Sequence, residues 1–153
     1  MIEHRPYGTW TSPIPAELLV AGAARLGDLV AEGGRTWWSE GRPAEGGREQ
    51  IVRRDPDGTV HEILPDGFGA RTRVHEYGGG AWWVHDGTLF FTNWVDQRLY
   101  RLDPPGTGPS APVPLTPEPP TPHAWRYADG RLRVGMDEVV CAVIFPPSEC
   151  AGR

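Results

Sequence analysis

The chain has few cysteines and no long apolar segment. Its 153 residues include only two cysteines, Cys141 and Cys150. Two thiols at this spacing make neither a disulfide framework nor a zinc site, so we expect Cys141 to be a small buried hydrophobe. No apolar run approaches the ~18 residues of a membrane-spanning helix, and the N-terminus is too polar for a signal peptide. We therefore expect a cytoplasmic protein.

The sequence also lacks a recognisable catalytic nucleophile. The Gly-x-Ser-x-Gly pattern of serine hydrolases is absent. Ser12 and Ser148 adjoin prolines, Ser39 lies between Trp38 and Glu40, and Ser110 lies in a Pro/Gly loop. We expect the chain by itself to be catalytically inactive.

Charge of either sign is too dispersed to indicate a polyanionic partner. The formal net charge is −5 and the arginines form no long run. These features favour neither nucleic acid nor an anionic membrane surface as a partner. The pair Arg53 and Arg54 is more consistent with a solvated strand face than with an anion site.

What the chain does contain is glycine, proline and tryptophan. Its 20 Gly and 17 Pro indicate either disorder or a fold rich in loops. Its seven Trp argue against disorder, because unstructured segments are poor in aromatic residues. An all-β fold with many turns satisfies both observations.

An internal repeat of about fifty residues makes that prediction specific. The two aromatics, hydroxyl residue and polar residue at 37–40 recur at 90–93, and the turn sequence at 55–59 recurs at 103–107. Such a period is typical of a four-stranded β-propeller blade. We predict a partial β-propeller with about two four-stranded blades and the start of a third.

The turn residues divide the chain into short expected strands. These are residues 26–31, 35–39, 50–54 and 59–64 in the first unit, and 80–84, 88–93, 98–102 and 113–115 in the second, with 41–47 as a polar loop and a third unit opening at 123. Ser12 and Pro13 are suited to begin one short N-terminal helix. The predicted regions are an arm at 1–25, the partial propeller at 26–131 and a divergent tail at 132–153, in which 137–145 can still form a strand.

The segment from Arg71 to Gly80 concentrates charged residues just before an expected inner strand. Arg73, His75, Glu76 and Tyr77 are the candidates for facing a channel or contacting substrate. The same side chains are equally suited to hydrogen-bonding one blade to the next, and we favour that structural role.

Cofactor and metal sites are not predicted. The glycines at 78–80 precede a strand, whereas a phosphate loop leads into a helix, so close packing of strand backbones is favoured. His75 and Glu76 lie at the opposite end of an expected strand from His85 and Asp86, about 20 Å away at ~3.3 Å per residue. One metal ion cannot reach both pairs.

The same residues carry a family resemblance. The chain resembles the N-terminal propeller of prolyl oligopeptidase-family serine peptidases, and within them the bacterial dipeptidyl aminopeptidase/acylaminoacyl peptidase group. The matching segments are residues 7–14, 38–43, 73–80, 91–93, 96–100, 115–117 and 126–129.

The resemblance implies that the chain is part of a larger enzyme. In this family the propeller covers an α/β-hydrolase domain that carries the catalytic triad, and it restricts entry to short peptides. The implied partners are that missing domain, the remaining blades and short peptides. Because the family pattern is lost after Arg131, we expect a truncated or frame-shifted product that self-associates through open blade edges. The alternative is a free-standing module that binds a peptide or a protein.

Overall fold

The computed structural model describes residues 6–8, 14, 23–76, 78–108, 111–133 and 138–144. The predicted N-terminal helix falls outside these residues, so it stays a prediction. The all-β prediction is confirmed for the described part, where the only helical element is one short 3₁₀ turn, Pro43–Glu45. No helix in that part is long and apolar enough to cross a membrane.

In the described part of the chain, ten strands form three separate antiparallel sheets. The first contains β1 (Arg25–Glu32), β2 (Arg35–Arg42), β3 (Arg48–Arg54) and β4 (Val60–Glu62) in that order; the second contains β5 (Trp82–His85), β6 (Thr88–Thr92), β7 (Leu99–Leu102) and β8 (Val113–Pro114); the third pairs β9 (Arg126–Arg133) with β10 (Glu138–Ile144). Within each sheet every strand pairs antiparallel with the next one along the chain, whereas β4 and β5, and β8 and β9, belong to different sheets.

Two boundaries differ from those expected. The expected loop at 41–47 begins later, because β2 continues to Arg42 in register with Arg48 of β3. The expected boundary between residues 131 and 132 falls inside β9, and β10 forms a hairpin with that strand. The described residues after 131 therefore belong mostly to the third sheet.

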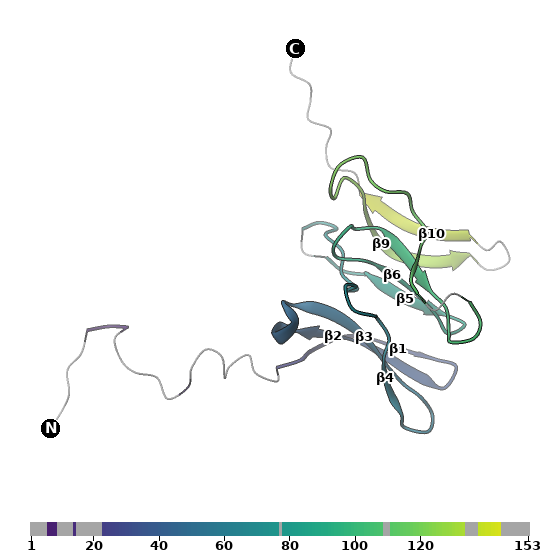
Figure 1. Ribbon diagram of the computed structural model, residues 1–153, viewed down its shortest axis with the longest axis horizontal. Coiled ribbons are helices and arrows are strands. Elements are labelled where there is room, and N and C mark those ends of the chain that lie inside the picture. Colours follow the sequence, from purple (N-terminus) through teal and green to yellow (C-terminus); the bar gives the residue numbers. More distant parts are fainter. Residues whose placement is uncertain are drawn as a thin grey trace, which may run out of the picture.

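The second sheet lies between the other two, as Figure 1 shows. Trp82 and Phe91 belong to the core shared with the first sheet, whereas Trp83 and Phe90 belong to the core shared with the third. Neighbouring residues divide between two cores because side chains alternate across a strand. The rings of Trp83 and Phe90 stack at 5.1 Å between centroids.

The first strands of the three sheets are neighbours. Strand β5 lies against both β1 and β9. The amide of Asp129 in β9 donates to the carbonyl of Gly80 beside β5 at 2.8 Å. The Glu32 carboxylate at the end of β1 accepts hydrogen bonds from the amides of Asp86 and Gly87, both at 3.0 Å. Polar contacts therefore tie each sheet to the next at its first strand.

Among the described residues, nothing covers the outer faces of the first and third sheets. On β1, Leu26 is 70% exposed and Leu29 is 71% exposed. Leu29 pairs with Trp38, which faces away from the core residue Trp37. On β10, Val140 is 56% exposed. The three-sheet array therefore has a buried middle and exposed leucines on the first sheet, whereas Val140 lies among the charged residues Arg131, Arg133 and Glu138.

Replacing Gly130 with Ala should destabilise the fold. An added Cβ at Gly130 would lie 1.9 Å from the ring of Trp83. Overpacking of this kind costs about 1–3 kcal/mol of unfolding free energy, measurable by urea denaturation. Gly69→Ala is the control, since its added Cβ would meet no atom closer than 3.4 Å. Equal stability of the two variants would contradict the packing of β9 on β5.

Candidate functional site

Most of the predicted site residues lie on the segment that connects the first sheet to the second, here called the connecting segment (residues 63–81). The amide of Ala70 in this segment donates to the carbonyl of Glu49 at 2.9 Å. The amide of Trp94, in the turn between β6 and β7, donates to the carbonyl of Gly69 at 2.9 Å. The segment is therefore attached to both sheets at the end where β3 begins and β6 ends.

Arg73 is held through its backbone and stacked through its side chain. Its amide donates to Oε1 of Gln97 at 2.7 Å. Its guanidinium lies over the indole ring of Trp94, 3.9 Å from the ring centroid, and that of Arg71 lies 4.4 Å away. The structure thus brings Arg73 to an aromatic side chain on the second sheet.

Gln97 is one of two site residues that sequence reasoning missed. It is fully buried and has a left-handed backbone, with φ 58°. Its Nε2 donates to the carbonyl of Trp94 at 2.9 Å, while its Oε1 accepts from Arg73. Buried polar groups need such partners. The available signal was its place in a polar turn, residues 93–98, directly after an aromatic strand.

His75 and Glu76 form a tight turn with left-handed backbones, φ 53° and 66°. The amide of Glu76 donates to the carbonyl of Arg73 at 3.0 Å. The carboxylate of Glu76 is 75% exposed and forms an ion pair with Arg126 of β9, which also donates to the carbonyl of Arg73 at 3.0 Å. Tyr77, the fourth candidate, lies outside the described residues.

This arrangement supplies the interactions between sheets that the sequence suggested. Arg126 joins the connecting segment to the third sheet, and sequence reasoning did not identify it. Its hydrogen bond and charge lower the pKa of Glu76 below the usual value. The pKa of Glu76 is lower in the folded chain than in the unfolded chain, so the ion pair of Glu76 with Arg126 stabilises the fold at pH values above the unfolded-state pKa. This stabilisation is lost as the pH falls through the folded-state pKa.

The glycines at 78–80 behave as packing residues at two of their three positions. A Cβ on Gly80 would lie 2.9 Å from the backbone nitrogen of Asp129, and one on Gly78 would lie 3.0 Å from the carbonyl oxygen of Thr72. Gly79 has no atom within 4 Å of such a Cβ, but its φ of 122° favours glycine. Close packing is confirmed at Gly78 and Gly80.

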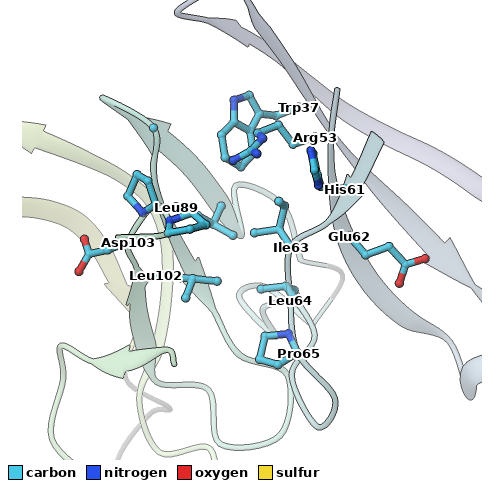
Figure 2. A pocket seen from close by; sticks show the side chains of 13 residues that line it. Trp37, Arg53, His61, Glu62, Ile63, Leu64, Pro65, Leu89, Leu102 and Asp103 are labelled. Atoms are coloured by element: carbon cyan, nitrogen blue, oxygen red, sulfur yellow. The ribbon is translucent and has the colours of Figure 1, made fainter. Parts of the chain in front are cut away.

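A cavity of about 410 Å³ opens between the first and second sheets (Figure 2). Its apolar wall includes Trp37, Leu89 and Leu102. His61 and Arg53 also line it, and both pair with Asp55, at 3.0 and 2.9 Å. Arg53 is thus half-buried rather than on a solvated face, unlike exposed Arg54.

Reactive groups are sparse in the described part of the chain. The lining of the 410 Å³ cavity between the first and second sheets includes no serine, threonine or cysteine. No three His, Cys, Asp or Glu side chains among the described residues are placed to share a metal ion. Cys141 is half-buried against the core between the second and third sheets, and burial raises the pKa of its thiol. A thiol with a raised pKa is a poor nucleophile.

Comparison with known proteins places this geometry in context. No family model and no curated protein matches the chain. A puromycin-hydrolysing peptidase from Mycobacterium tuberculosis is 40% identical, with a TM-score of 0.75 over 91% of this chain and 22% of its own. A puromycin hydrolase is 39% identical, with a TM-score of 0.74 over 90% of this chain and 22% of its own. The resemblance to the prolyl oligopeptidase family is confirmed. The chain spans about a fifth of the length of these peptidases.

Removing the guanidinium of Arg126 should release Glu76. In Arg126→Gln the pKa of Glu76 should rise toward the ordinary value for glutamate, because the hydrogen bond and the charge that lower it are removed. The measurement is an NMR titration of the Glu76 carboxyl carbon. Arg133→Gln is the control, because Arg133 pairs with Glu138 instead. A pKa of Glu76 that is the same in Arg126→Gln and in the unaltered chain would refute the ion pair.

Proposed function

We propose that the three sheets are consecutive blades of a β-propeller, with two complete four-stranded blades and the first two strands of a third. The repeat of about fifty residues supports this arrangement. So does the contact of β5 with both β1 and β9, because the first strands of successive blades meet around a propeller axis. Both four-stranded sheets have the same strand order.

We further propose that this propeller segment gates a serine peptidase that acts on short peptides in the cytoplasm. The observation that carries the proposal is the identity of 39–40% with puromycin-hydrolysing peptidases over about 90% of the chain. The catalytic serine would reside in an α/β-hydrolase domain outside these residues. The role left for this chain is to cover that domain and limit which substrates enter.

The uncovered face of the first sheet supports the same proposal. Leu26 and Leu29 expose apolar surface on the first sheet, at one end of the array. Apolar patches of this kind mark contact surfaces. In the proposed enzyme the remaining blades cover them, and in the isolated chain they promote self-association.

A chimera provides the functional test. Residues 23–144 of this chain would replace the matching segment of the M. tuberculosis puromycin-hydrolysing peptidase. No hydrolase residue is altered, so hydrolysis of puromycin and of short peptides should stay within about tenfold of the parent rate, equivalent to ~1.4 kcal/mol in the barrier. Hydrolysis of a long unfolded protein should remain slow.

The control is the same peptidase with the matching segment deleted. This deletion should lose activity or lose discrimination between short and long substrates. The gating proposal would be rejected by a folded chimera that degrades long unfolded protein as fast as it degrades a tripeptide.

A further inference from the structure

Two arginines stack on one indole at an end of the sheet array. The guanidinium carbons of Arg71 and Arg73 lie 4.4 and 3.9 Å from the ring centroid of Trp94. We call this group the Arg71–Trp94–Arg73 stack. A guanidinium held flat over an aromatic ring keeps its N–H donors in the plane of the group, where an acceptor can approach them.

The backbone dictates this arrangement. Arg71 and Arg73 flank a buried residue, and both guanidinium groups reach the same indole ring. Thr72, between the two arginines, is buried at 1% exposure. The amide of Arg71 donates to the carbonyl of Thr92 at 3.0 Å, which aligns the segment with the end of β6. Trp94 is fixed in turn by Gly69 and Gln97 through its backbone.

The two guanidinium groups have no carboxylate partner among the described residues. Arg42, Arg48 and Arg126, at the same end of the array, all form ion pairs. Arg71 is exposed and Arg73 is half-buried, so N–H groups of this pair remain accessible to an acceptor from outside the chain.

A cavity of about 240 Å³ adjoins the stack. Arg71 and Trp94 line it, whereas Arg73 lies outside the lining, on the Trp94 ring. Four of the other lining residues are glycines: Gly46, Gly47, Gly67 and Gly69. Its acidic residues are already engaged, because Glu45 pairs with Arg42 and Arg48, and Glu49 pairs with Arg25. Glycines leave room for another backbone to approach closely.

We propose that the Arg71–Trp94–Arg73 stack binds the C-terminal carboxylate of a short peptide whose last residues lie in this cavity. The choice of a peptide rests on the proposed function, whereas the choice of a carboxylate rests on the two unpaired guanidinium groups. The planar guanidinium fork matches a carboxylate through two parallel hydrogen bonds. The site thus favours peptides with a free C-terminus.

Calorimetry with the full 153-residue chain tests this site directly. The probes are triglycine and triglycine amide, which differ in whether the C-terminus is charged. The free acid should bind at least about tenfold more tightly than the amide, which corresponds to ~1.4 kcal/mol from a charge-assisted contact. Inorganic phosphate, added as a competitor, should not displace the acid at equal concentration.

The variants Arg71→Gln and Arg73→Gln should each abolish the preference for the acid. Arg73→Lys retains the charge but loses the planar fork, so it should restore only part of that preference. Arg101→Gln is the control, because Arg101 is an exposed arginine already paired with Asp103 at 2.7 Å. Tryptophan emission confirms that each variant is folded, and two independent substitutions guard against loss of the fold in one.

Equal affinity for acid and amide would overturn the proposal. So would an acid preference that survives both glutamine substitutions, or displacement of the acid by phosphate, which would indicate a general anion patch. The outcome is independent of the gating proposal, because the titration requires no hydrolase domain. A chimera that fails alongside a clear acid preference would reject gating alone.

Discussion

Burial of the second sheet on both faces is the constraint on which the other features of the chain depend. Trp82 and Phe91 are buried against the first sheet, and Trp83 and Phe90 against the third. Each large side chain contributes about 1.5–3 kcal/mol on burial, so the four together rival the ~5–15 kcal/mol stability of a typical domain. The second sheet therefore requires a neighbour on each side. Among the described residues, the first and third sheets each have a neighbour on one side only.

The charged site follows from how the chain passes between these sheets. The connecting segment crosses from β4 to β5 and is anchored by buried amides, above all that of Gln97. The anchoring holds Thr72 inside and leaves Arg71 and Arg73 stacked on Trp94. At the far end of the segment, Glu76 reaches the third sheet through Arg126. One segment thus both fastens the sheets together and presents the charged groups for recognition.

Local sequence signals predicted the strands well, because turn residues and alternating aromatics report the local backbone. These signals placed both four-stranded sheets and the close packing at Gly80, which lies against Asp129. They did not reveal the pairing of Arg126 with Glu76 or the burial of Gln97. Both depend on contacts between residues distant in sequence, which no spacing rule encodes. The expected tail boundary after residue 131 falls inside a local hairpin, whose second strand β10 lies within the strand expected at 137–145.

Light scattering of the isolated 153-residue chain, combined with a thermal melt followed by tryptophan fluorescence, tests the central claim most directly. The account predicts association beyond a single chain, or a broad and non-cooperative melt, because the apolar face bearing Leu26 and Leu29 has no neighbouring sheet among the described residues. A monomer that unfolds in one sharp transition would contradict it. That result would mean that three sheets with uncovered outer faces suffice for a stable protein.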